Sequence, residues 1–276
     1  MMSVPRIASA VAAFLVLFTL AGDAPAGDVP AFAENVPKFK SGEPIFQFNG
    51  TDLSGFYPYT VKQKYEDKKH VISVQDSVIR VSGEEFGGFA TCGNFRDYHL
   101  VAEWKWGGKT WPPREKASRD SGILLHCVGA DGAAGSGWME SIECQIIEGG
   151  CGDFILVGGR NKPTLTCETR LGDDSQLYFH PGGTPVTRDS ARYNWWGRDL
   201  EWKDVLGFRG RDDVQKPAGE WNRLDVYCDG DSISVVLNGV LVNAGTKSSL
   251  TEGKILFQSE GAEILFRKIE VRPIVR

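Results

Sequence analysis

Carboxyl, amide and imidazole side chains recur at alternate positions of strand-like segments in this chain. Glu143 and Gln145 alternate with apolar side chains in residues 141–147, and His126 shares the polar face of residues 122–128. Because successive side chains of a strand point to opposite faces, this spacing predicts one polar face on each strand. Carboxyl and imidazole groups that share a cleft can transfer protons, since burial and neighbouring charges shift their pKa values toward neutral pH.

The same alternation recurs in residues 98–106 and 254–260. If the sheet is curved, its concave side becomes a cleft that fits an extended polar ligand such as a sugar. A solvated outer sheet face would give the same pattern for any single strand. The mixture of acids, amides and a histidine favours a site over a plain wet surface. Seven side chains are expected in this cleft: Glu103, Lys105, His126, Glu143, Gln145, Gln258 and Glu260.

The elements that must position these side chains are predicted to be strands. About ten short strand-like runs are separated by turn signals, and no window beyond the N-terminal apolar run keeps helical spacing for three turns. Asn238-Gly239 between two apolar runs is typical of a type I′ hairpin turn. Strands without intervening helices predict an all-β jelly-roll sandwich of two antiparallel sheets. Residues 148–217 break the alternation and are expected to form a long loop-rich insertion.

Two adjacent tryptophans, Trp195 and Trp196, lie in this insertion. Sugar rings stack well on aromatic faces, so the pair is a candidate platform for substrate. The alternative is that both rings plug the end of the sandwich.

Charge and the N-terminal sequence limit the classes of partner. The formal net charge is −5, from 31 Lys+Arg against 36 Asp+Glu in 276 residues, so no nucleic-acid partner is expected. Residues 1–26 combine Arg6, an apolar run and a small-residue cleavage site, which is typical of a signal peptide. An uncleaved membrane anchor is the alternative. We expect a linker over residues 27–40, a single domain over 41–276, a secreted or periplasmic location, and no membrane span after cleavage.

Export would permit disulfides among the six cysteines. We expect one or two bridges in the loop-rich stretch from Cys144 to Cys167. Cys127 and Cys144 lie in apolar runs, where a buried free thiol is an equally good interpretation.

An ordered set of short motifs resembles the 3-keto-disaccharide hydrolase family. The motifs are residues 48–56 (FNGTDLSGF), 120–126 (DSGILLH), 142–148 (IECQIIE), 219–222 (GEWN), 237–239 (LNG), 255–261 (ILFQSEG) and 264–269 (ILFRKI). The resemblance implies a concanavalin A-like jelly roll. This chain departs from the family pattern at Phe56, where the motif has Trp, and at His126, where many members carry Arg.

The resemblance implies a substrate whose glucose unit carries a ketone at C3. The ketone acidifies the hydrogen on C2, so the glycosidic bond can break by elimination, and water addition then restores the keto sugar. This chemistry needs a base, an acid for the departing oxygen, and a group that stabilises the enolate. We expect Glu143 or His126 to be the base. Lys105, or a divalent metal ion held by His126 and Glu143, would stabilise the enolate.

An oligosaccharide or glycoside is therefore the expected partner. Six side chains are expected to bind it: Glu103, Gln145, Gln258, Glu260, Trp195 and Trp196.

Two other functions suit the same fold. Glu143 and Glu148 resemble the E-x-D-x-x-E signature of retaining β-glucanases, with Gln145 in place of the central Asp. Two carboxylates about 5–5.5 Å apart would support double displacement there. The other alternative is a non-catalytic sugar-binding module with Trp195 and Trp196 as its platform.

Overall fold

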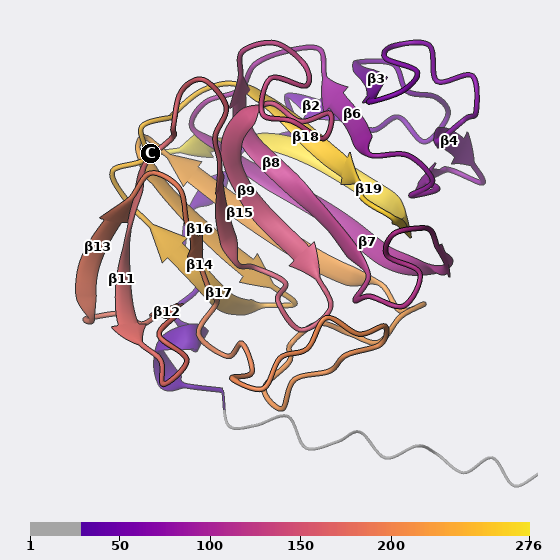
Figure 1. Ribbon diagram of the computed structural model, residues 1–276. Coiled ribbons are helices and arrows are strands. Elements are labelled where there is room, and N and C mark those ends of the chain that lie inside the picture. The colour runs from indigo at the N-terminus through magenta and orange to yellow at the C-terminus, as the bar shows by residue number, and fades with distance from the viewer. Residues whose placement is uncertain (1–28) are drawn as a thin grey trace, which may run out of the picture.

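Alternating apolar side chains pack two antiparallel sheets face to face in the computed structural model, which describes residues 29–276 (Figure 1). The nine-stranded sheet has the order β17 (Val240–Gly245), β16 (Ser232–Leu237), β15 (Asn222–Asp229), β7 (Tyr98–Thr110), β19 (Ala262–Val275), β5 (Val78–Val81) and β4 (Ile72–Gln75), and β1 (Lys40–Ser41) and β2 (Phe46–Gln47) also pair with β19. The seven-stranded sheet has the order β14 (Arg192–Tyr193), β10 (Phe154–Val157), β9 (Glu140–Ile147), β8 (Asp120–Val128), β18 (Lys254–Ser259), β6 (Gly87–Thr91) and β3 (Phe56–Thr60).

The core between the sheets uses one side of each long strand. Trp104 and Trp106 of β7 belong to one buried cluster with Phe266 of β19 and Phe257 of β18, and all four are at most 1% exposed. The rings of Phe257 and Phe266 lie 5.3 Å apart across the sandwich. Burial of one such side chain contributes about 1.5–3 kcal/mol to stability. The core therefore fixes the two sheets relative to each other.

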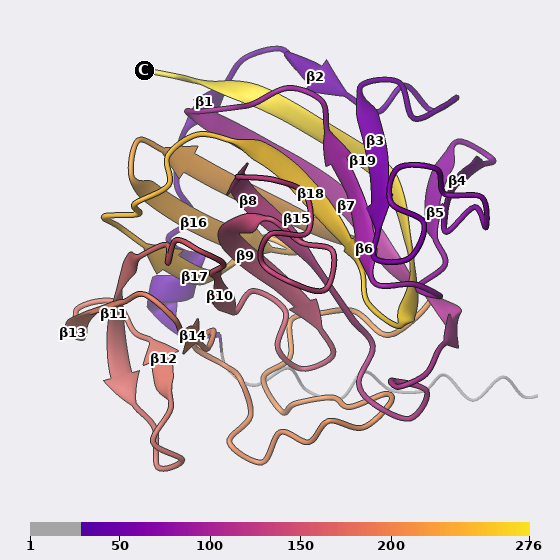
Figure 2. The same cartoon turned by 45° about the horizontal axis from the view of Figure 1, so that its top comes forward.

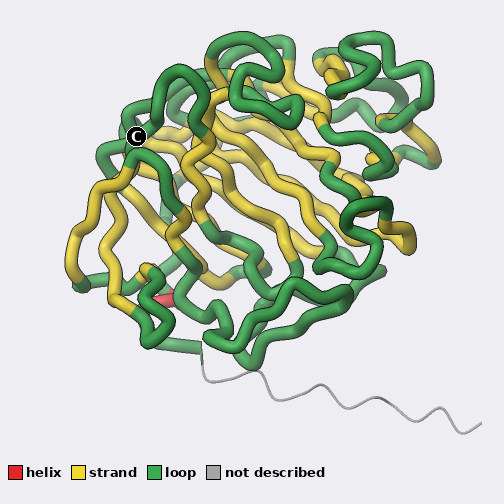
Figure 3. The backbone as a smooth tube through the Cα atoms, viewed as in Figure 1, coloured by secondary structure: helices red, strands yellow, loops and turns green. Residues whose placement is uncertain are grey.

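The predicted all-β jelly-roll sandwich is confirmed. Strands dominate the chain in Figure 3, and the one helical segment of the described residues is η1 (Ala31–Glu34), a 3₁₀ turn. The hairpin at Asn238-Gly239 joins β16 to β17 with positive φ at both turn residues, as a type I′ turn requires.

Residues 148–217, expected to be a loop-rich insertion, contain five strands. Of these, β10 and β14 extend the seven-stranded sheet. A separate three-stranded sheet is formed by β12 (Leu177–Phe179), β11 (Leu165–Leu171) and β13 (Thr184–Arg188). Figure 2 shows this small sheet at the opposite end of the molecule from β3 and β4. The loop that follows β14 folds back on the seven-stranded sheet. There, Trp202 Nε1 donates a hydrogen bond to Glu148 O, just after β9, at 2.8 Å.

The expected signal peptide, residues 1–26, lies outside the described residues. Within the expected linker, η1 packs against the core through Ala33, which is fully buried. In residues 29–276, no helix is long and apolar enough to cross a bilayer.

All six cysteines carry free thiols in the structure, so the prediction of one or two bridges in the stretch from Cys144 to Cys167 is wrong. Five of the six are buried and Cys92 is exposed. Cys144 and Cys167 are core side chains that pack among apolar neighbours, as free thiols commonly do.

Candidate active site

The outer side of the seven-stranded sheet, opposite the core, carries a cluster of polar side chains. Ile123 of β8 pairs with Cys144 of β9 and Phe257 of β18, and all three side chains point into the core. Their neighbours along each strand therefore point outward, because strand side chains alternate. Five acid and amide side chains meet there, and we call them the polar face: Asp120, Glu143, Gln145, Gln258 and Glu260.

Gly122 makes room at the centre of the polar face. A Cβ atom at this position would lie 2.5 Å from Gln258 Oε1 and would also contact Glu143 Oε1. The two side chains thus fold toward each other over the Cα atom of Gly122. Glycine is needed here because of this close approach, since its φ is not in the left-handed region.

Several buried polar atoms of this face have no hydrogen-bond partner in the structure. They are Asp120 Oδ1, Glu143 Oε1, Gln145 Oε1 and both amide atoms of Gln258. Buried polar atoms are usually paired, so orphans on four neighbouring side chains call for an explanation. A polar ligand with several hydroxyl groups would supply the missing partners.

The three carboxyl groups of the polar face hold protons unusually well. Burial raises the pKa of Glu143 to about 8, and the charge of Asp120 adds to this effect. Burial also raises the pKa of Asp120 to about 7, although Arg114 opposes the shift. The pKa of Glu260 is raised well above its usual value by burial and then by Asp120 and Glu143. Carboxylates this close cannot all ionise at neutral pH, so the face holds exchangeable protons.

Two arginines border the carboxyl groups. Arg114 Nη2 lies 3.1 Å from Asp120 Oδ2 and 3.1 Å from Asp204 Oδ1. On the other side, the charge of Arg192 lowers the pKa values of Asp120, Glu143 and Glu260.

Arg192 is held in place by the fully buried Asp153. Arg192 Nη1 donates to Asp153 Oδ2 at 2.9 Å, and the side chain of Arg198 binds the same oxygen. The backbone N–H of Trp195 donates to Asp153 Oδ1 at 2.8 Å. These contacts fix one positive charge beside the polar face.

The same side of the sheet is apolar beyond Glu143. Leu124 pairs with Glu143 and packs in a second buried cluster with Ala90, Cys127, Met139 and Leu256. Tyr57 and Trp138 pack against this cluster. A ligand on the outer side therefore meets carboxyl and amide groups at one end and hydrocarbon at the other.

Four of the side chains expected in one cleft do come together: Glu143, Gln145, Gln258 and Glu260. His126 does not, because β8 contains a bulge between Leu125 and Val128 where His126 has a φ of 52°. The ring is fully buried, lies edge-on to Tyr98 at 5.5 Å, and bonds Leu250 O through Nδ1 at 2.9 Å. Burial lowers the pKa of His126 to about 4. A bulge reverses the alternation, so the predicted face of His126 is wrong.

Lys105 and Glu103 are also placed away from the polar face. Both belong to β7 in the nine-stranded sheet, and both point outward from that sheet. Lys105 Nζ lies 4.8 Å from the centre of the Trp221 ring, and Glu103 Oε2 accepts a hydrogen bond of 2.6 Å from Arg267. The sandwich core separates them from Glu143, so their predicted place in a common cleft is wrong.

The adjacent tryptophans follow the alternative interpretation, in which they plug the end of the sandwich. Trp195 is 1% exposed and Trp196 is 8% exposed. Their ring nitrogens donate to Gly149 O at 3.2 Å and to Leu241 O at 2.8 Å. A pair of buried rings cannot serve as an open stacking platform, although Trp196 borders a cavity beside the three-stranded sheet.

The metal ion expected between His126 and Glu143 does not fit these residues. The two side chains lie on opposite sides of the seven-stranded sheet, so they cannot share one ion. In the part of the chain that the structure describes, no group of three His, Cys, Asp or Glu side chains is arranged to hold a metal.

Sequence reasoning missed Asp120, Arg114 and Arg192. Asp120 could have been found from the sequence. Alternation along residues 120–124 places Asp120, Gly122 and Leu124 on the same side of the strand, opposite Ile123. The arginines gave no such signal because they reach the face from a loop and from the two-residue strand β14.

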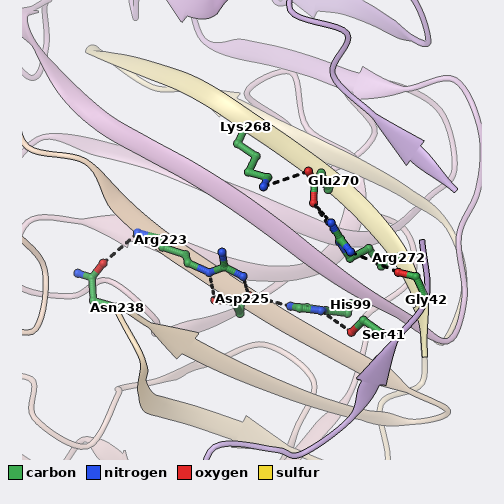
Figure 4. A network of polar contacts seen from close by, with 9 residues as sticks. All are labelled: Ser41, Gly42, His99, Arg223, Asp225, Asn238, Lys268, Glu270 and Arg272. Carbon is green, nitrogen blue, oxygen red and sulfur yellow. Dashed lines mark hydrogen bonds and ion pairs between the residues drawn. The ribbon is translucent and has the colours of Figure 1, made fainter. Parts of the chain in front are cut away.

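A second polar network lies on the outer side of the nine-stranded sheet (Figure 4). Ser41 Oγ lies 2.7 Å from His99 Nδ1, and His99 Nε2 lies 2.8 Å from Asp225 Oδ1. These are the residue types of a nucleophilic triad. However, Arg223 donates two hydrogen bonds of 2.7 Å to the same carboxylate, and Tyr227 stacks on the imidazole at 4.2 Å. The arginine already neutralises the acid, so the network serves to tie β1 and β15 to β7.

Comparisons with known proteins identify relatives of the domain and of the fold. Residues 43–272 match the model of the 3-keto-alpha-glucoside-1,2-lyase-like domain. No match is found among curated proteins.

Similar solved structures share the sandwich at low sequence identity. A provisionally assigned glycosyl hydrolase from Parabacteroides distasonis is 18% identical, with a TM-score of 0.46, and the match covers 83% of this chain and 92% of that one. A β-glucanase from Bacillus licheniformis is 11% identical, with a TM-score of 0.43 and coverage of 87% and 100%. LamA from Zobellia galactanivorans, solved with laminaritriose and laminaritetraose, is 8% identical, with a TM-score of 0.45 and coverage of 84% and 100%.

Proposed function

Because the chain belongs to the 3-keto-alpha-glucoside-1,2-lyase-like family, and thus to carbohydrate-active proteins, we propose that it cleaves the glycosidic bond of 3-keto-glycosides on the polar face. The observation that carries this proposal is the set of unpaired, buried acid and amide atoms on adjacent strands. Residues 1–26 of the sequence support a secreted or periplasmic location for the reaction.

Glu143 is the base in this mechanism. Its carboxylate removes the hydrogen from C2 of the keto sugar, and the electron pair of that C–H bond moves toward the ketone to form an enolate. The enolate then collapses to an enone, and the bond from C1 to the glycosidic oxygen breaks. A pKa of about 8 suits this role, because a base works best when its pKa lies near the working pH.

The leaving oxygen needs a proton, and the raised pKa values of Asp120 and Glu260 make either one a suitable donor. Water then adds to C1 and a proton returns to C2, which regenerates the 3-keto sugar. The net reaction is hydrolysis by elimination and addition.

Arg192 stabilises the negative charge of the enolate. A fixed positive group aimed at developing charge is often the largest single contribution to catalysis. Asp153 holds this guanidinium, so it needs no reorganisation during the reaction. Gln145 and Gln258 carry unpaired amide oxygens that can accept hydrogen bonds from sugar hydroxyls.

The alternative of a retaining glucanase receives no support from Glu148. Its Oε1 pairs with Arg119 Nη1 at 2.6 Å, and its Oε2 accepts from the backbone N–H of Gly207 at 2.7 Å. Glu148 thus anchors a loop instead of joining Glu143. The alternative of a sugar-binding module gives no reason for three carboxyl groups with raised pKa values on one face.

The experiment compares 3-keto-trehalose with unmodified trehalose as substrates for the purified protein, with and without a chelator. We expect free sugar only from the ketone-bearing substrate. A C2-deuterated 3-keto-glucoside should react more slowly, because the C2–H bond breaks in the proposed step. Equal rates for both trehaloses, or wild-type turnover by Glu143→Gln, would rule out this mechanism. Sugar binding without turnover of either substrate would favour the sugar-binding module.

A further inference from the structure

Two adjoining cavities lie beside the three-stranded sheet, apart from the polar face. The larger has a volume of about 560 Å³ and the smaller about 360 Å³. Both are bordered by the same four side chains, and we call the joined space the Arg170 groove: Arg170, Trp196, Arg211 and Asp212. Each volume falls within the range of about 300–1,000 Å³ that is usual for small-molecule sites.

Five separate segments of the chain build the larger cavity. Arg170 comes from β11, Trp196 follows β14, and Phe32 belongs to η1. The ring of Phe32 stands edge-on to Trp196 at 6.1 Å and to His180 at 5.9 Å. These edge-on contacts hold the aromatic side chains in place, so the cavity has a preformed apolar border.

Arg170 supplies an uncompensated positive charge. Its guanidinium lies 4.9 Å from the centre of the Tyr178 ring. No carboxylate within residues 29–276 forms an ion pair with it. A guanidinium that is stacked on a ring but lacks an acid partner presents its donors to a ligand.

The other two charged side chains of the larger cavity, Arg211 and Asp212, neutralise each other. Arg211 Nη2 pairs with Asp212 Oδ2 at 3.1 Å, and this arginine side chain is 83% exposed. The arginines and the acid of the lining are Arg170, Arg211 and Asp212, so one positive charge remains among them. A ligand with one negative charge matches this balance, and a carboxylate fits the planar fork of Arg170.

The smaller cavity has a different lining. It adds Asp199 and Glu201 to the shared residues, together with Arg198, which is already paired with Asp153. Mixed acids and arginines suit the hydroxyl groups of an uncharged sugar, since both can hydrogen-bond to them.

We propose that the Arg170 groove binds an acidic oligosaccharide, with the carboxylate of a uronic acid unit on Arg170 and a neighbouring sugar in the smaller cavity. The choice of a sugar rests on membership in a carbohydrate-active family, but binding here does not require the reaction on the polar face. The groove is a second ligand site of the same domain.

The test is isothermal titration of the full-length protein with cellobiouronic acid, which carries one carboxylate, and with cellobiose as the uncharged probe, at about 0.15 M salt, where exposed charges are screened beyond about 8 Å. We expect the binding of cellobiouronic acid to exceed that of cellobiose. Arg170→Ala should weaken the binding of cellobiouronic acid about tenfold or more, because a hydrogen bond to a charged group is lost. Asp212→Asn should strengthen it, since a repelling charge is removed.

Arg188→Ala is the matched control, because Arg188 is an exposed arginine of the same small sheet that does not border the groove. This variant and Glu143→Gln should bind like the wild type. Equal binding of cellobiouronic acid and cellobiose, or equal binding of cellobiouronic acid by the wild type and Arg170→Ala, would overturn the proposal. If Glu143→Gln loses turnover of 3-keto-trehalose but binds the acidic probe like the wild type, the two sites are independent, as proposed.

Discussion

Glu143 and Gln258 reach toward each other from the two strands that flank β8, and their Oε1 atoms meet over the Cα atom of Gly122. Neither oxygen has a hydrogen-bond partner in the structure. Two oxygens that can only accept hydrogen bonds would repel each other at this short range. Protonation of Glu143 removes the conflict, because its O–H can then donate a hydrogen bond to the amide oxygen of Gln258. The raised pKa of Glu143 agrees with this arrangement.

Gly122→Ala should abolish most of the activity on 3-keto-glycosides without unfolding the protein. The added methyl group would occupy the space into which both Oε1 atoms project, so Glu143 and Gln258 would have to turn away. A misplaced catalytic group commonly costs about a hundredfold in rate. Steady-state kinetics and a thermal melt would measure the two effects. Gly108→Ala is the control, because no atom lies within 4 Å of its added Cβ. Full activity in Gly122→Ala would contradict the proposed site.

Turnover should depend on pH through Glu143. The base must be ionised, and its pKa in the free protein is about 8, so kcat/KM should rise with pH up to that value. Glu143→Gln should lower kcat by roughly 10²–10⁴, the usual contribution of a general base. A rate that is flat between pH 6 and 9 would exclude Glu143 as the titrating base.

The same carboxyl group should make the protein less stable at high pH. Its pKa is raised from 4.5 in the unfolded chain to about 8 in the folded one, so the folded state binds the proton more tightly. The destabilisation therefore begins above pH 4.5 and is complete above about pH 8. Glu143→Gln, which stays neutral, should melt at a higher temperature than the wild type at pH 8 and at nearly the same temperature at pH 4. The opposite order at pH 8 would show that Glu143 is not buried as described.

The sequence predicts the sandwich well because alternation and turn residues are local signals. The same signals place Glu143, Gln145 and Gln258 on the polar faces of their strands, and the pairing of β9 and β18 with β8 brings those faces together. They fail for His126, since one extra residue in β8 reverses the side to which the chain points.

Long-range pairing accounts for the other differences. Alternation along β7 correctly separates Lys105 from the core, but it cannot assign that strand to the nine-stranded sheet. Arg192 is likewise invisible in a strand pattern, because its place depends on the pairing of β14 with β10 and on the carboxylate of Asp153.

Lys105→Ala should leave kcat/KM on a 3-keto-glycoside unchanged. The ammonium group contacts the exposed side of Trp221 on the outer face of the nine-stranded sheet, across the core from Glu143. An exposed cation–π contact contributes about 0.5–1 kcal/mol, so a small drop in melting temperature is the expected effect. A large loss of turnover in a folded variant would place the reaction on the other sheet.

Arg192→Ala should slow turnover and also shift its pH dependence. The charge of Arg192 lowers the pKa of Glu143, so its removal should move the rising limb of the pH–rate profile to higher pH. The enolate would lose its positive partner, and removal of one such group typically costs about 10²–10³ in kcat. Arg192→Lys should restore part of the rate and return the limb toward its original position, because it keeps the charge. A merely structural role for Arg192 would change the melting temperature but leave the midpoint of the pH profile where it is.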